Sequence, residues 1–224
     1  MVSQILSKYF SVFVDELIEC GVDSVVLSPG SRSTPLAMLF YARKEIKCYM
    51  NIDERSAAFF ALGLSKESQT PTVLVCTSGS AAANYYPAIV EANLARVPLI
   101  VITADRPPYM QGVGAAQTMY QKELYGRHVV YHEELALAKN DFDYQLLREK
   151  AAHFFLLSKN LKGVVHINAP VEEEVIPEIL DEYYSVGRNQ KICGAEVKIA
   201  FSAQESLLSH LQNKKVLIVV GFED

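Results

Sequence analysis

Short apolar runs rich in valine and isoleucine alternate along this chain with stretches in which apolar positions recur at helical intervals. The apolar runs lie at 24–28, 72–77, 98–103, 163–168 and 215–221. The helical stretches lie near 3–20, 34–44, 54–67, 81–95 and 143–160. Strands that are apolar on both faces and separated by helices indicate a parallel sheet that is covered on each side. The pattern therefore predicts an α/β fold, a doubly wound parallel sheet with helices on both faces.

The pattern changes after about residue 170, where the acidic stretch APVEEEVIPEILDEYYS begins. We interpret 180–195 as a linker, followed by a helix at 203–213 and by the apolar strand at 215–221. That strand is typical of the opening of a second α/β unit, and no helix follows to cover it. We therefore expect a first domain at 1–182 and, at 183–224, a linker with the incomplete start of a second domain.

Three loops that follow predicted strands are rich in glycine and in hydroxyl, amide or arginine side chains. They lie at 28–34, 77–84 and 104–117. In a doubly wound sheet the loops after the strands gather at the carboxyl edge, where ligands bind. The longest loop mixes proline, glycine and polar residues, which favours a binding loop over a simple connection.

Composition narrows the class of partner. The chain has 224 residues, half of them hydrophobic, and a net charge of −5 without a long run of lysine and arginine. This charge pattern argues against nucleic acid or an anionic membrane surface as a partner. The apolar runs are far shorter than the roughly 20 residues of a membrane helix. Four widely separated cysteines without a Cys-x-x-Cys pair argue against a disulfide framework and a thiolate metal site, so we expect a reduced, cytoplasmic protein.

An acidic pair, Asp53 and Glu54, stands at the head of the mostly apolar stretch NIDERSAAFFALGLSK. One interpretation is local, because Asp53 is a plausible N-cap and a carboxylate in the first helical turn is favoured by the helix dipole. The other is that Glu54 faces a buried ligand and shares a proton with it. Burial would raise the pKa of this acid and the helix terminus would lower it, so spacing alone leaves both interpretations open.

The stretch SPGSRST predicts a tight turn followed by a helix start, with Ser33 or Thr34 as N-cap and Pro35 at the first helical position. Arg32 then points from the turn at the ligand-binding edge. It is either an ordinary surface arginine or a fork that grips a carboxylate in bidentate fashion.

Other candidate motifs carry less information. TSGSAAAN at 77–84 is a generic polar cradle and lacks the lysine and glycine spacing of a P-loop. GVGAAQ at 112–117 does not follow a strand and has Gln117 where a dinucleotide fingerprint needs glycine, so we reject it. The histidines show no metal-binding spacing, and we interpret His166 as a satisfied core residue.

Taken together, SPGSRSTPLAM, NIDERSAAFFALGLSK, TSGSAAANYYPAIVEANLARVPLIVITADRPP and GAAQT resemble the N-terminal, pyrimidine-binding domain of thiamine-diphosphate-dependent enzymes. The resemblance runs from about residue 5 to 170, in order and at consistent spacing. It implies that Glu54 is catalytic: it binds the aminopyrimidine ring nitrogen of the cofactor and drives the ring toward its imino form. It also places Ser78, Gly79 and Ser80 in the loop near the cofactor pyrimidine.

Within this superfamily, SPGSRSTPL, TADRPP and GAAQ narrow the resemblance to the carboligases of menaquinone biosynthesis. It then implies decarboxylation of 2-oxoglutarate and addition of the succinyl unit to isochorismate. Both substrates are anionic, and the resemblance assigns Ser31, Arg32 and Gln117, with Arg106 as a weaker candidate, to substrate binding.

The chain contains no G-D-G motif, so the resemblance implies that ligands for Mg²⁺ and for the cofactor diphosphate lie outside it. We therefore expect the chain to be inactive alone and the complete enzyme to be a homodimer or a dimer of dimers. Two alternatives remain: another thiamine-diphosphate-dependent decarboxylase or carboligase similar to acetolactate synthase, and a non-catalytic dimerisation or binding domain.

Overall fold

A computed structural model describes residues 2–138, 143–173 and 175–188. The chain divides into two compact units, Met1–Gly194 and Ala195–Asp224. All elements named below belong to the first unit. The strand expected at 215–221 and the helix expected at 203–213 lie outside the described residues, and the domain boundary expected at residue 182 stays a prediction.

Six parallel strands form one sheet in the order β2-β1-β3-β4-β6-β5. Their bounds are β1 Ser24–Leu27, β2 Lys47–Met50, β3 Thr72–Cys76, β4 Leu99–Asp105, β5 Tyr131–Glu134 and β6 Val164–Pro170. The predicted α/β doubly wound fold is confirmed for the described residues. The sequence pattern found the four inner strands and missed β2 and β5, which are the two edge strands of the sheet.

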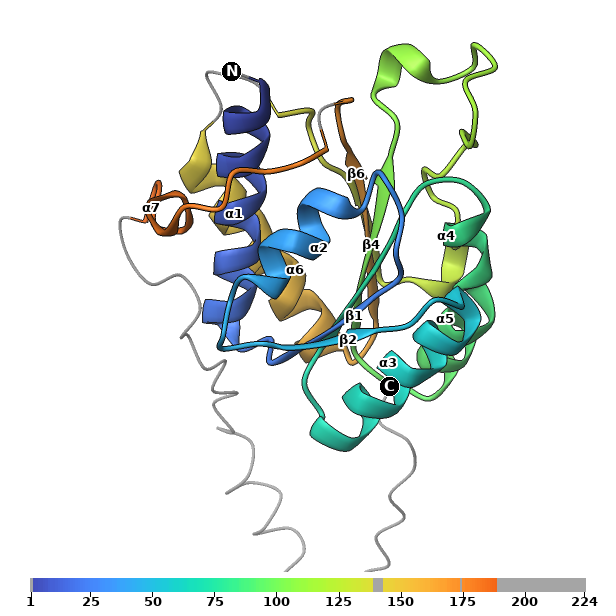
Figure 1. Ribbon diagram of the computed structural model, residues 1–224. Coiled ribbons are helices and arrows are strands. Elements are labelled where there is room, and N and C mark those ends of the chain that lie inside the picture. The colour runs from blue at the N-terminus through green and yellow to red at the C-terminus, as the bar shows by residue number, and fades with distance from the viewer. Residues whose placement is uncertain (1, 139–142, 174, 189–224) are drawn as a thin grey trace, which may run out of the picture. The chain divides into compact units, whose positions relative to one another are not determined.

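Helices cover both faces of the sheet (Figure 1). On one face lie α1 Val2–Cys20, α2 Thr34–Tyr41 and α6 Tyr144–Leu161, and on the other lie α3 Glu54–Ser68, α4 Ser80–Asn84 and α5 Tyr86–Leu94. Neighbouring strand residues serve opposite faces, since Val25 and Leu27 join the first core and Val26 joins the second. Two 3₁₀ turns, Pro108–Met110 and Gly126–His128, and the short α7 Asp181–Tyr184 complete the described elements.

The helix predicted at 81–95 is two helices, α4 and α5, which meet at Tyr85. Pro87 lies in the first turn of α5. A proline has no N–H to donate to the carbonyl four residues earlier, and its ring crowds that carbonyl, so a continuous helix is interrupted there. The buried Tyr85 side chain anchors the junction in the second core.

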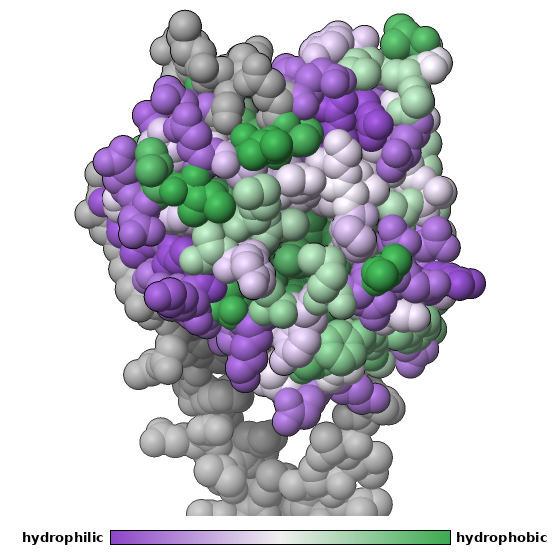
Figure 2. All heavy atoms as spheres, in the orientation of Figure 1, coloured by the Kyte–Doolittle hydropathy of each residue, from purple (hydrophilic) through white to green (hydrophobic). Residues whose placement is uncertain are grey.

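Figure 2 shows apolar side chains over the middle of the face in view, with hydrophilic side chains toward its margins. The exposed large apolar residues include Met50 of β2, Ile52 of the following turn, and Phe59 and Phe60 of α3. No helix among the described residues has the length and apolar character that crossing a membrane requires. Cys48 and Cys76 are free thiols.

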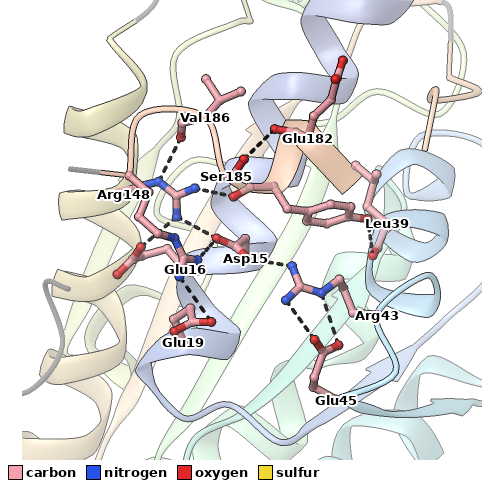
Figure 3. Close-up of polar contacts among 12 residues, drawn as sticks. Asp15, Glu16, Glu19, Leu39, Arg43, Glu45, Arg148, Glu182, Ser185 and Val186 are labelled. Atoms are coloured by element: carbon pink, nitrogen blue, oxygen red, sulfur yellow. Dashed lines mark hydrogen bonds and ion pairs between the residues drawn. The ribbon is translucent and has the colours of Figure 1, made fainter. Parts of the chain in front are cut away.

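A buried network of charges joins α1 to α6 (Figure 3). Arg148 of α6 is fully buried, and its Nη1 lies 2.8 Å from Asp15 Oδ2 and 2.9 Å from Glu16 Oε2. Arg43 lies 2.6 Å from the other Asp15 oxygen, and Arg188 also pairs with Asp15. Three guanidinium groups thus share two buried carboxylates.

The described part of the predicted linker belongs to this network. Arg148 donates to the carbonyl oxygens of Tyr184 and Val186, and the Tyr184 hydroxyl donates to Leu39 O at 2.9 Å. Both Tyr183 and Tyr184 are buried, and α7 packs on α1. The chain up to Arg188 is therefore part of the packed first unit.

Candidate functional site

The residues proposed from the sequence lie in the loops that leave the carboxyl ends of neighbouring strands. Arg32 follows β1, Glu54 follows β2, Ser78 follows β3 and Arg106 follows β4. Because the strands are parallel, these loops emerge at one edge of the sheet (Figure 1).

The loop after β1 approaches the end of β3 closely. A Cβ atom on Gly30 would lie 2.3 Å from Thr77 Cβ, so only glycine fits there. Ser33 is the residue before α2, but its hydroxyl donates back to Ser28 O and Gly30 O instead of capping the helix. The predicted helix start with Ser33 at the N-cap position is confirmed, but its hydroxyl closes the preceding turn and makes no capping bond.

Glu54 is the first residue of α3, directly after its N-cap. The Asp53 carboxylate accepts from Ser56 N at 3.1 Å, which confirms the predicted N-cap, and Arg55 and this N–H hold the pKa of Asp53 at about 2. Glu54 is half-buried, and within the described ranges no hydrogen bond or ion pair engages its carboxylate. Burial chiefly, and the nearby Glu54 in addition, raise the pKa of the Cys76 thiol at the end of β3. Glu54 thus lies near the end of β3.

Arg32 is buried, and its guanidinium group already has hydrogen-bond partners within the chain. It is 5% exposed, and its Nη1 donates to Val171 O at 2.9 Å while its Nη2 donates to Glu173 Oε1 at 2.5 Å. The interpretation as an ordinary surface arginine is wrong, because the turn folds the side chain under the segment after β6. Arg32 contacts the carboxylate of Glu173 through one nitrogen only, and the bidentate contact with a ligand carboxylate stays a prediction. Ser31, next to it, is exposed.

Ser78, Arg106 and Gln117 meet one another. Arg106 Nη1 donates to Ser78 Oγ, Ser78 Oγ donates to Gln117 O at 3.0 Å, and Gln117 Nε2 donates to Ser78 O at 3.0 Å. Arg106 Nε is buried without a hydrogen-bond partner. Burial and then the neighbouring Arg32 lower the pKa of Arg106, which shows that two guanidinium groups lie near one another here.

Gly79 and Ser80 continue the turn after β3. Gly79 has φ of 80°, and its N–H donates to Gln121 Oε1 at 2.7 Å. Ser80 is exposed and begins α4. The structure therefore brings Ser78, Gly79, Arg106 and Gln117 into contact or close proximity.

Sequence reasoning missed four residues at this edge. They are Tyr109, Gln121, Glu172 and Glu173. The Tyr109 hydroxyl donates to Glu172 Oε2 at 2.7 Å, and this contact raises the pKa of Tyr109. A signal was available for both glutamates, because the acidic stretch directly follows a predicted inner strand and so belongs to the same carboxyl edge.

The long loop after β4 also lines a cavity. A cavity of about 380 Å³ is lined by Gln111, Gly112, Gly114, Ala115, Thr118, Met119 and Tyr120. The segment 112–117 has neither a strand before it nor a helix after it, in line with the rejection of a dinucleotide fingerprint.

No group of three His, Cys, Asp or Glu residues in the described ranges could hold a metal ion. His166 is buried and hydrogen-bonded to Thr103 and His132, which confirms it as a satisfied core residue.

A parallel sheet covered on both faces, with a half-buried free acid and two arginines at its carboxyl edge, defines an α/β ligand-binding domain. Residues 7–124 match the family model described as thiamine pyrophosphate enzyme, N-terminal TPP binding domain. The chain belongs to this family.

Curated relatives carry one common name. Proteins named 2-succinyl-5-enolpyruvyl-6-hydroxy-3-cyclohexene-1-carboxylate synthase are similar to this chain in Geobacillus kaustophilus, at 52% identity over 78% of this chain and 30% of the relative, and in Listeria innocua, at 48% identity over the same shares. The relative from Listeria welshimeri is 42% identical over 97% of this chain and 39% of its own length. The chain thus spans about a third of the length of these relatives.

Proposed function

We propose that this chain forms the pyrimidine side of a thiamine-diphosphate site, in a protein that decarboxylates 2-oxoglutarate and adds the succinyl unit to isochorismate. Membership of the TPP-binding family and the name shared by the relatives support this proposal. The observation that carries it is the position of Glu54, a half-buried carboxylate without a partner at the start of α3. The proposed protein works in the cytoplasm as a homodimer or a dimer of dimers.

The residues at this edge fit the aromatic part of the cofactor. Glu54 has a free carboxylate, and Gly79 offers a turn whose Cβ position is already crowded by Gln117 Cγ at 3.0 Å. Thr77 Oγ1 is buried there without a hydrogen-bond partner. A planar ring with polar edge atoms would satisfy these groups. We propose that the ligands of Mg²⁺ and of the diphosphate lie in the part of the relatives that this chain does not cover.

Glu54 would hold a proton between its carboxylate and a ring nitrogen of the bound pyrimidine. The partial burial of this acid strengthens the shared hydrogen bond, because the local dielectric constant is low. Thiamine diphosphate, when bound, supplies the electron sink for loss of carbon dioxide from a 2-oxo acid. Ser78, Gly79 and Ser80 would line the ring, since they form the turn next to it.

Arg32 and Arg106 would bind the carboxylates of the anionic substrates, with Ser31 and Gln117 beside them. An arginine fork matches a carboxylate in geometry and charge. The buried Arg106 Nε without a hydrogen-bond partner supports this role, as does the pKa of Arg106, which burial and then the neighbouring Arg32 lower. An anionic substrate would supply a counter-charge.

The test is a chimera in which residues 1–182 of this chain replace the matching segment of the Geobacillus kaustophilus relative. Glu54→Gln should lower kcat by at least about 100-fold, because general acid–base groups contribute on that order. Asp53→Asn is the matched control, since asparagine also caps helices and Asp53 is exposed. Ordinary turnover with Glu54→Gln would contradict the proton-sharing role. Acetolactate-type products from the unaltered chimera would assign the chain to a different carboligase.

A further inference from the structure

The glycine turn after β3 is held by a side chain from a distant loop. Gly79 N donates to Gln121 Oε1 at 2.7 Å, and Gln121 is 1% exposed although it lies outside any helix or strand. Gly79 adopts φ of 80° and ψ of −147°, a region that favours glycine. Glycine is also the most freely rotating residue, so this turn needs an external contact to fix its amide.

The orientation of the Gln121 amide is determined by its other contacts. Its Nε2 donates to Ala104 O at 3.2 Å and to Asn168 Oδ1 at 2.9 Å. A flipped amide would place Nε2 against the Gly79 N–H and Oε1 against two acceptors, and every contact would be lost. Gln121 therefore bridges the ends of β4 and β6 to the turn after β3.

The bridge continues as a directed row of hydrogen bonds. Thr103 Oγ1 donates to Asn168 Oδ1 at 2.9 Å, so its one proton is used and it must accept from His166 Nε2 at 2.8 Å. His166 Nδ1 then accepts from His132 Nδ1 at 3.0 Å, and His132 Nε2 accepts from Glu123 N at 3.3 Å. The row begins and ends in the same loop, because Gln121 and Glu123 are neighbours.

We propose that Gln121 is a positioning residue that fixes the Gly79 amide, and with it the turn Ser78–Ser80, against the sheet. Gln121 acts through Gly79 and itself touches no substrate. The rigid support is the row of buried side chains on β4 and β6, two strands that are buried along their whole length. This inference rests on the proposed function, in which the turn lines the cofactor ring.

The test replaces Gln121 by methionine, which has a similar length and no amide. Gln111→Met is the matched control, because Gln111 lies in the same loop and donates one bond to a backbone carbonyl, Arg106 O, at 3.2 Å. In the full 224-residue chain, amide hydrogen exchange followed by NMR should be about tenfold faster at Gly79 with Gln121→Met and unchanged there with Gln111→Met. If Gln121→Met does not fold, Gln121→Asn serves, since its shorter side chain cannot reach both Gly79 and Asn168.

The functional readout is the split between KM and kcat in the chimera. Gln121→Met should raise the KM for thiamine diphosphate by about tenfold with a smaller change in kcat. Unchanged Gly79 exchange, or an equal rise at all slow amides of β3, would overturn the inference, since the latter indicates loss of stability alone. A chimera that turns over without thiamine diphosphate would instead overturn the proposed function and leave the Gly79 result standing.

Discussion

Arg32 and Glu173 form an unequal pair. The Arg32 side chain is 6% exposed and the Glu173 side chain is 70% exposed. A buried guanidinium needs a counter-charge, because an unpaired buried charge is costly. An exposed carboxylate, in contrast, loses little when it moves into water. Glu173 can therefore leave Arg32 when another carboxylate takes its place, and in the proposed function it competes with the substrate.

We expect Glu173→Gln to lower the KM for 2-oxoglutarate in the chimera by about fivefold. The substitution keeps an acceptor near Arg32 and removes the competing charge, and a fivefold change in KM corresponds to about 1 kcal/mol. Glu172→Gln is the control, because Glu172 contacts the Tyr109 hydroxyl. A raised KM with Glu173→Gln would show that Glu173 holds Arg32 in its binding position and does not compete.

Single residues differ in how far their roles can be predicted from the sequence. The cap at Asp53 was predictable, because its partner, the Ser56 N–H, lies three residues away. The partner of Arg32 was not, since Glu173 lies 141 residues further along the chain. Gln121 was missed for the same reason, because its contact with Gly79 depends on how the long loop folds back. Local chemistry is readable in a pattern, whereas pairing across the sheet requires the fold.

At the scale of elements, the inner strands were predictable and the edge strands were not. β1, β3, β4 and β6 are buried along their whole length and so appear as continuous apolar runs. β2 and β5 have one free side each, and their residues, KCYM and YHEE, are partly exposed. The loops after β1, β3 and β4 were therefore predictable from the inner strands, whereas the place of Glu54 after the edge strand β2 was not.

The attachment of α6 to α1 depends on Arg148, whose Nη1 bridges Asp15 and Glu16 at 2.8 and 2.9 Å. We expect Arg148→Met to lower the free energy of unfolding by about 3–5 kcal/mol, because it leaves buried carboxylates with fewer counter-charges. Urea denaturation at neutral pH measures this loss. Arg55→Met is the control, since the Arg55–Asp53 pair is exposed on both sides, and we expect a much smaller loss of stability. Equal losses in the two variants would contradict a special role for the buried network.

At the scale of the whole molecule, the row of hydrogen-bonded polar side chains on β4 and β6 lies between the two apolar cores. The apolar cores on the two faces of the sheet hold most of the buried side chains, yet Thr103, His166 and Asn168 lie fully buried among them on β4 and β6. The row of hydrogen bonds is complete only when His132 and His166 are both neutral, because each ring then donates once and accepts once. Burial and the neighbouring His132 lower the pKa of His166 to about 3. Global stability is thereby linked to pH.

The sign of this linkage follows from the two states of His166. An unfolded histidine has a pKa of about 6.5, so between pH 6.5 and about 3 the unfolded chain binds a proton that the folded chain excludes. The contribution of His166 to stability is complete above pH 6.5 and declines as the pH falls. From pH 7 to pH 5 we expect the free energy of unfolding to fall by about 2 kcal/mol through this residue.

Urea denaturation of the original chain and of His166→Gln isolates the effect, because other groups titrate in both proteins. The variant is less stable at pH 7 but should lose about 2 kcal/mol less on acidification; equal losses would show that His166 accepts a proton within the fold.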